Sequence, residues 1–267
     1  MAFLQVNYYS KFIGKESMMN VILPERDGHN PNRTAKQLSD IPVLYLLHGM
    51  GNDFSAWSRR TNIERLVRLT DLAIVMPDTD LGWYTNTASG LKYFDATSKE
   101  LFEKVALMFP QISKKVEKHF IAGVSMGGYG AFKMALATDY FSYAASLSGA
   151  LTLDFSYPQV FQMAPQAYWE GIFGNLDDFH ESENDLLTLA KKRIDDKKTL
   201  PKLYAWIGQQ DFLLPANEYA VPKLKALGYD LTYKTDPGRH EWYYWNKQIE
   251  NVLEWLPIKY IKEERLS

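Results

Sequence analysis

Ser125 lies in the segment Gly123-Val124-Ser125-Met126-Gly127, where two glycines flank a serine at the spacing Gly-x-Ser-x-Gly. The mostly apolar residues 119–122 before it predict the end of a buried strand, and residues 131–137 after it predict a helix. A strained strand-to-helix turn needs these glycines, because side chains there would collide with the neighbouring strand and helix. The turn lifts the serine hydroxyl out of the sheet, and the helix N-terminus directs unpaired N–H groups toward an oxyanion beside it. Ser125 is therefore our candidate nucleophile.

Two later loops carry the residue types that would activate this serine. Asp211 follows the strand predicted at 202–207, and His240 lies in a turn just before the last predicted helix. The chain order serine, aspartate, histidine is the order of an α/β-hydrolase. In that arrangement His240 takes the proton of Ser125 and later returns one to the leaving group, while Asp211 fixes the imidazole tautomer and stabilises the imidazolium.

Several other aspartates and histidines are weaker candidates because of where they lie relative to the predicted strands. The aspartates between Ser125 and His240 that we weigh against Asp211 fall in the long segment after residue 150; they are Asp154, Asp177 and Asp178. We expect three histidines to be solvated at the surface. His29 lies in the polar loop, His119 precedes a strand, and His180 lies in an acidic segment.

A second glycine-containing turn follows another apolar run, in Leu46-Leu47-His48-Gly49-Met50-Gly51. A His-Gly turn at this point is where α/β-hydrolases place one backbone donor of the oxyanion hole, and the residue after the nucleophile supplies the other. We assign the N–H groups of Met50 and Met126 as these donors, each worth about 10²–10³ in rate. Since only the backbone is used, the two methionine side chains are free to pack in the core. His48 and Gly49 are expected to lie at the substrate pocket.

The elements that must position these loops alternate between strands and helices. Strands are predicted at 3–9, 18–23, 42–47, 72–77, 143–148, 202–207 and 231–235, with one more ending at Ser125, and helices at 62–69, 97–109, 184–192, 216–227 and 241–256 and directly after Ser125. The first two strands form a hairpin, and a polar loop follows at 24–40. Alternation with continuous apolar strands predicts a mostly parallel sheet covered by helices on both faces. Loops at the carboxyl ends of its strands would hold the active groups.

Residues 150–199 exceed a single crossover and contain many aromatic side chains, namely Tyr157, Phe161, Tyr168, Trp169, Phe173 and Phe179. We interpret this segment as an insertion above the sheet that forms a small lid, within a single domain over residues 1–267. The alternative is that the aromatic residues only pack the insertion onto the core. If they are exposed, they would also suit the interface of a homo-oligomer.

The composition of the chain excludes several other kinds of catalytic site. The chain has 267 residues, a net charge of -2 and no cysteine, which excludes disulfides, thiolate metal sites and a cysteine nucleophile. Without a His-x-x-x-His spacing a metal hydrolase is disfavoured, and we expect no metal and no cofactor. The small net charge gives no reason to expect nucleic acid or a membrane as partner. No signal-like N-terminus or membrane span is apparent, so we expect a cytoplasmic protein, although a chain trimmed of a signal peptide would read the same.

These motifs together resemble the esterase D-like family of α/β-hydrolases, most closely the bacterial tributyrin esterases. The resemblance covers nearly the full length, and its more telling segments are Gly82-Trp83-Tyr84-Thr85-Asn86 and His240-Glu241-Trp242. It implies a carboxylesterase without cofactor that acts on short-chain acyl esters, with relatives that cleave feruloyl esters or S-formylglutathione. By this resemblance the catalytic triad of the family corresponds to Ser125, Asp211 and His240, and its oxyanion-hole donors correspond to Met50 and Met126. Asn52-Asp53 and Arg239 depart from the family's pattern and leave the rim of the pocket undetermined.

The sequence thus predicts a serine carboxylesterase that hydrolyses a small-molecule ester through an acyl-enzyme. Trp83 and Tyr84 follow a predicted strand and either wall the substrate pocket or anchor a surface loop. The same triad can also run thioester hydrolysis or acyl transfer, because the pocket chooses the acceptor. A binding protein that keeps the fold without activity is the alternative of another class, and the presence of all three triad residue types speaks against it.

Overall fold

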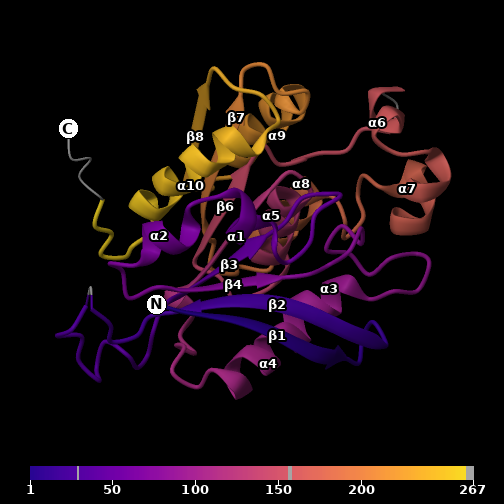
Figure 1. The fold of residues 1–267 in the computed structure, drawn as a ribbon. Coiled ribbons are helices and arrows are strands. Elements are labelled where there is room, and N and C mark those ends of the chain that lie inside the picture. Colours follow the sequence, from indigo (N-terminus) through magenta and orange to yellow (C-terminus); the bar gives the residue numbers. More distant parts are fainter. Residues whose placement is uncertain (29, 156–157, 263–267) are drawn as a thin grey trace.

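The computed structural model describes residues 1–28, 30–155 and 158–262, and their strands form a single eight-stranded sheet (Figure 1). Its strands are β1 (Ala2–Ser10), β2 (Lys15–Leu23), β3 (Val43–Leu47), β4 (Ala73–Pro77), β5 (His119–Val124), β6 (Tyr143–Leu147), β7 (Lys202–Gly208) and β8 (Leu231–Asp236). They are arranged in the order β1-β2-β4-β3-β5-β6-β7-β8. Each of these strands was predicted to within a few residues of its ends.

The strand directions explain where a site can form. β1 and β2 are an antiparallel hairpin and β2 is antiparallel to β4, whereas β3 to β8 run parallel. Every residue of β3, β4 and β5 is buried, which is why these strands read as continuous apolar runs. The carboxyl ends of β3, β5, β7 and β8 meet at one edge of the sheet, as expected for the α/β-hydrolase fold.

Helices cover both faces of the sheet, as predicted. They are α1 (Ala56–Arg60), α2 (Ile63–Val67), α3 (Tyr93–Asp95), α4 (Leu101–Met108), α5 (Met126–Ala137), α6 (Pro158–Met163), α7 (Gln166–Phe173), α8 (Leu186–Asp195), α9 (Leu214–Ala226) and α10 (Trp242–Trp255). One buried cluster joins the sheet to α4, α5, α8 and α9. A second, on the other face, joins it to α1, α2 and α10.

Two predicted helices are more broken than their apolar periodicity suggested. The helix predicted at 62–69 is the end of a pair, α1 and α2, separated at Thr61, whose hydroxyl donates to the carbonyl of Trp57. The helix predicted at 97–109 begins earlier, at α3, and passes through a π-helical turn at Ala96–Glu100 before α4. Buried Glu100 in that turn accepts hydrogen bonds from the hydroxyl of Ser10 and the N–H of Lys11, which tie the first hairpin to this helix.

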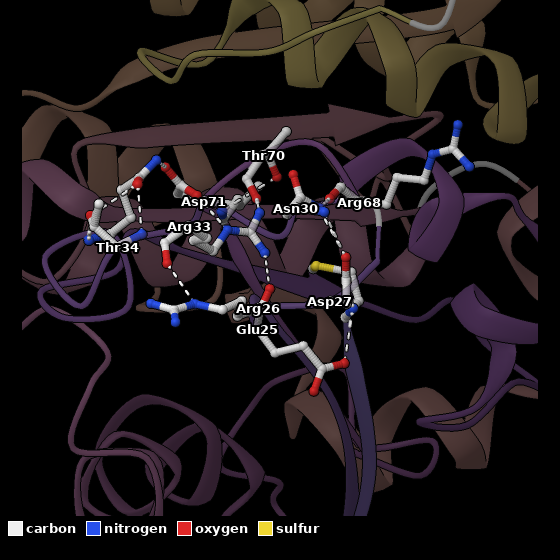
Figure 2. A network of polar contacts seen from close by, with 12 residues as sticks. Glu25, Arg26, Asp27, Asn30, Arg33, Thr34, Arg68, Thr70 and Asp71 are labelled. Atoms are coloured by element: carbon white, nitrogen blue, oxygen red, sulfur yellow. Dashed lines mark hydrogen bonds and ion pairs between the residues drawn. The ribbon is translucent and has the colours of Figure 1, made fainter.

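The polar segment at 24–40 was predicted as an exposed loop, but one of its charged residues is buried (Figure 2). The guanidinium of Arg33 is only 4% exposed and donates to the carbonyl oxygens of Glu25 at 2.6 Å and Thr70 at 2.7 Å, and to the carboxylate of Asp71 at 3.0 Å. These bonds fasten the loop against the turn before β4. His29 of this loop lies outside the described residues.

The insertion at 150–199 folds into α6, α7, a 3-10 turn at Leu176–Asp178 and α8. Its aromatic side chains pack inward, because Trp169 is fully buried 5.1 Å from the ring of Trp83, and Phe173 lies 6.4 Å from the ring of Tyr129. Phe179 is also buried, and Phe161, Tyr168 and Phe173 are half-buried. The described aromatic residues therefore pack the insertion onto the core, and that the insertion also forms a lid stays a prediction. Tyr157 lies outside the described residues.

Candidate active site

Ser125 occupies the sharp turn between β5 and α5 that its glycine spacing predicted. Its backbone has φ 55° and ψ -120°, a conformation that costs free energy for a residue with a side chain. A Cβ on Gly123 would lie 2.2 Å from the carbonyl oxygen of Gly127, and one on Gly127 would lie 2.4 Å from that of Leu47. Both glycines are therefore required by the close approach of helix and strands, and the serine is held in a strained conformation.

The structure brings Ser125, His240 and Asp211 together although they are far apart in the sequence. The Nε2 atom of His240 lies 2.9 Å from the Oγ atom of Ser125, and its Nδ1 atom lies 2.9 Å and 3.0 Å from the two carboxylate oxygens of Asp211. The Asp211 side chain is completely buried and also accepts a hydrogen bond from the N–H of Leu213 at 2.9 Å. Because a carboxylate only accepts, Nδ1 carries a proton and Nε2 faces the serine hydroxyl.

Two aromatic rings lie next to the imidazole of His240, and the sequence analysis did not single out either of them. Phe212 lies 4.6 Å from it between ring centroids, and Trp245 lies 4.9 Å away with its plane at 89° to the imidazole. The indole N–H of Trp245 donates to the hydroxyl of Ser148 at 2.9 Å. Only the position of Phe212 next to Asp211 was available as a signal in the sequence.

The turn after β3 has its backbone carbonyls anchored one after another. The indole N–H of Trp57 donates to the carbonyl of Leu47 and the hydroxyl of Tyr84 donates to that of His48, both at 3.0 Å. The Nδ1 atom of His48 lies 2.9 Å from the carbonyl oxygen of Gly49. Since a carbonyl oxygen only accepts, this Nδ1 carries a proton and donates. His48 is 1% exposed, so the side chain supports the turn from inside.

The other ring nitrogen of His48 faces the end of β4. Its Nε2 atom lies 3.1 Å from the backbone nitrogen of Thr79 and 3.2 Å from a carboxylate oxygen of Asp78. Burial raises the pKa of Asp78, whereas its contact with His48 and the backbone N–H of Asp80 lower it, and the net shift is downward. An ionised carboxylate therefore lies behind this turn.

Trp83 and Tyr84 are both fully buried and both adopt left-handed backbone conformations, with φ values of 50° and 49°. Tyr84 packs against α5 where a Cβ on Gly130 would come within 2.3 Å of its ring, so that glycine makes room for it. The indole N–H of Trp83 donates to the hydroxyl of Tyr168 at 2.9 Å. Neither side chain is exposed to solvent, and both support the site from behind; that they wall a substrate pocket stays a prediction.

Lys133 of α5 is a buried charged residue that the sequence analysis did not single out. Its Nζ atom donates to the hydroxyl oxygen of Thr85 and to the side-chain oxygen of Asn184, both at 2.6 Å, and it lies 5.6 Å from the centre of the Tyr129 ring. The side chain is 3% exposed, and burial lowers the pKa of Lys133 to about 7. Lys133 thereby joins α5, the segment after Tyr84 and the insertion.

The remaining histidines lie away from Ser125. His180 is exposed, as expected. The expectation for His119 was wrong: it is 9% exposed, its Nε2 atom donates to the carbonyl of Ser113, and its ring stacks on Phe102. Burial lowers the pKa of His119, which favours the neutral ring. Among the described residues, no cluster of histidine, aspartate and glutamate is arranged to hold a metal ion. In the same residues no helix is both long and apolar enough to cross a bilayer.

A parallel sheet with a serine at the β5–α5 turn and a hydrogen-bonded histidine and aspartate at the same edge defines an α/β-hydrolase of the serine type. The family profile described as "Putative esterase" matches residues 10–256, and the chain belongs to this family.

Individual relatives are similar over nearly their whole length. An acetyl esterase of Caldicellulosiruptor saccharolyticus is 32% identical over 96% of this chain and 98% of its own. Two solved structures of Staphylococcus aureus proteins, a fluorophosphonate-binding serine hydrolase F and an S-formylglutathione hydrolase, are each 34% identical and cover 96% of this chain and 98% of theirs, with TM-scores of 0.83 and 0.82. The chain is a serine hydrolase that acts on carboxylic esters.

Proposed function

We propose that this enzyme hydrolyses esters of short-chain acyl groups, with Ser125 as nucleophile, His240 as general base and acid, and Asp211 as the residue that orients His240. The observation that carries the proposal is the continuous set of contacts from Ser125 Oγ through both ring nitrogens of His240 to Asp211. The preference for short acyl groups is supported by the acetyl esterase relative. The butyryl groups of tributyrin-like esters are also short acyl groups and belong to the proposed substrates.

The proposed reaction follows from these contacts. His240 takes the proton of Ser125 as its oxygen attacks the ester carbonyl, and the imidazolium is stabilised by the buried carboxylate of Asp211. The tetrahedral intermediate collapses when His240 gives its proton to the leaving alcohol. Water then attacks the acyl-enzyme by the same steps in reverse and frees Ser125.

The developing oxyanion would be bound by the backbone N–H groups of Met50 and Met126. Met126 is the first residue of α5, so its N–H is among those without a partner inside the helix. In the trans peptide between Gly49 and Met50, the carbonyl and the N–H point in opposite directions. Because the ring of His48 holds that carbonyl, it also holds the direction of the Met50 N–H, and we assign His48 as a positioning residue.

Thioester hydrolysis is a second candidate because an S-formylglutathione hydrolase is 34% identical over 96% of this chain. The same nucleophile and base would serve, and only the leaving group would differ. Comparing kcat/KM for S-formylglutathione with that for a short p-nitrophenyl ester separates the two. A feruloyl ester belongs in the same comparison as a bulky acyl group.

We further propose that residues 150–199 form a cover beside the site. The proposal is supported by the contacts of Tyr168 and Asn184, which join this insertion to Trp83, Thr85 and Lys133. In that role the insertion would limit the acyl chains that fit. A p-nitrophenyl series from acetate to laurate measures this limit, and we expect activity to fall beyond butyrate or hexanoate.

The decisive experiment is Ser125→Ala, with Ser39→Ala as the control because Ser39 is exposed in the polar loop. Loss of the nucleophile should lower kcat on p-nitrophenyl acetate on the order of 10⁶-fold. An organophosphate should label and inactivate the native enzyme and the control but leave Ser125→Ala unlabelled. Undiminished hydrolysis by Ser125→Ala would exclude the proposed mechanism.

A further inference from the structure

Phe212 is a large apolar side chain next to the imidazole of His240. Its side chain is 57% exposed, whereas its neighbours Asp211 and Leu213 are 4% and 7% exposed. Single exposed apolar residues are common on protein surfaces, so exposure alone carries no conclusion. Phe212 differs from these because its ring lies 4.6 Å from that of His240, whose own side chain is 19% exposed. The two rings therefore lie in contact and are both partly exposed to solvent.

The chemistry of ester cleavage determines which part of a substrate would lie beside the rings of His240 and Phe212. To protonate the leaving alcohol, the Nε2 atom of His240 must come within hydrogen-bond distance of the leaving oxygen. The acyl carbonyl instead lies beside Ser125 and the donors of the oxyanion hole. The alcohol portion must consequently extend from Nε2 along the imidazole of His240.

Trp245 restricts the direction that the alcohol portion can take. It is 5% exposed, packs edge-on against His240 and is fixed by its hydrogen bond to Ser148. Of the two aromatic rings described here next to the imidazole, that of Phe212 is the exposed one. An alcohol group leaving past His240 would meet an apolar aromatic surface there.

On the basis of the roles proposed above for Ser125 and His240, we infer that Phe212 forms an alcohol-side subsite. It favours esters whose alcohol portion carries an aromatic ring. Contact between two aromatic rings changes a binding equilibrium by about two- to tenfold. Phe212 is thus a specificity-determining residue, and its effect should appear before the alcohol has left.

The test compares two acetates whose alcohols differ in shape and have similar acidity, benzyl acetate and 2-methoxyethyl acetate. The value of kcat/KM reports the steps up to alcohol release, whereas hydrolysis of the common acetyl-enzyme does not involve the alcohol. The variants are Phe212→Ala and Phe212→Leu. Tyr140→Ala is the matched control, because Tyr140 is an aromatic residue 42% exposed that precedes β6 and stacks on Phe102.

We expect Phe212→Ala to lower kcat/KM for benzyl acetate about fivefold, while that for 2-methoxyethyl acetate stays within about twofold. Phe212→Leu should fall between, and Tyr140→Ala should change neither. An equal loss for both esters, together with a shifted pH profile of kcat/KM, would mean that Phe212 only positions His240 and would overturn the inference. Unchanged values for both would overturn it as well. Organophosphate labelling of Ser125 in Phe212→Ala separates this failure from a failure of the proposed mechanism.

Discussion

Replacing Lys133 by Met should remove a large part of the pH dependence of folding stability. Lys133 is buried, its ammonium group donates to the uncharged oxygens of Thr85 and Asn184, and the charge of Glu183 offsets only part of the effect of burial. Its pKa of about 7 in the folded protein compares with an ordinary value of 10.5. The unfolded chain therefore binds more protons than the folded one between these two values.

The sign and size of the effect follow from this difference. Where the unfolded state binds more protons, the free energy of unfolding rises with pH, so Lys133 favours folding as it loses its proton. Between pH 6 and pH 9 the two pKa values predict a gain of about 2 to 3 kcal/mol from this residue. The gain continues until the unfolded chain also releases its proton, near pH 10.5.

The assay is urea unfolding at pH 6, 7, 8 and 9 of the native protein, Lys133→Met and Lys225→Met. Lys225 is the matched control because it is an exposed lysine of α9. Lys133→Met loses hydrogen bonds at every pH, so the absolute stability shifts, but its slope with pH should be lower by the amount given above. Parallel slopes for native protein and Lys133→Met would refute the reasoning, and would mean that the ammonium is as well solvated folded as unfolded.

Two further predictions concern the catalytic constellation, both measured as steady-state kinetics on phenyl acetate at neutral pH. Asp211→Asn should lower kcat about 10⁴-fold with little change in KM, because an amide can donate to Nδ1 of His240 and favour the wrong tautomer; a loss below tenfold would remove Asp211 from its role. His48→Leu should lower kcat about ten- to hundredfold with KM nearly constant, because the carbonyl of Gly49 keeps only the N–H of Asn52 at 3.2 Å. His48→Asn, which can still donate to Gly49, should retain more of kcat, and equal activity of the two variants would contradict the positioning role.

Secondary structure in the sheet could be predicted because its strands have a strong local signal. β3 and β4 are buried on both faces, so nearly every residue had to be apolar. The helix breaks had weaker signals, since the turn at Thr61 depends on a side-chain hydrogen bond to Trp57. Of the helices in the insertion, α8 was predicted at 184–192 but α6 and α7 were not. The aromatic residues of α7 pack against Trp83 and Tyr129, which lie far away in the sequence.

In the candidate site, too, features set by neighbouring residues in the sequence could be predicted, whereas features set by distant residues could not. The turn at Ser125 is recognisable from its glycine spacing, and Gly123 is required by its contact with Gly127, four residues away. Gly127 is required by the carbonyl of Leu47, a distant contact that the local pattern does not show. Phe212, Trp245 and Lys133 could not be recognised, because each acquires its role from a partner brought near only by the folded chain. His119 was misplaced for the same reason: its carbonyl partner Ser113 and its stacking partner Phe102 lie on other elements.

The anchoring of the turn after β3 explains why so many large side chains are buried around a small reaction centre. The carbonyls of Leu47, His48 and Gly49 are held by Trp57 of α1, by Tyr84 and by the ring of His48. An oxyanion hole accelerates a reaction because its donors need no reorganisation when charge develops. A loop free to rotate its peptides would lose that advantage even with the same backbone N–H groups. If the Met50 N–H binds the oxyanion as proposed, the buried aromatic residues around this turn act on catalysis through rigidity, and substitutions there should lower kcat before they change substrate binding.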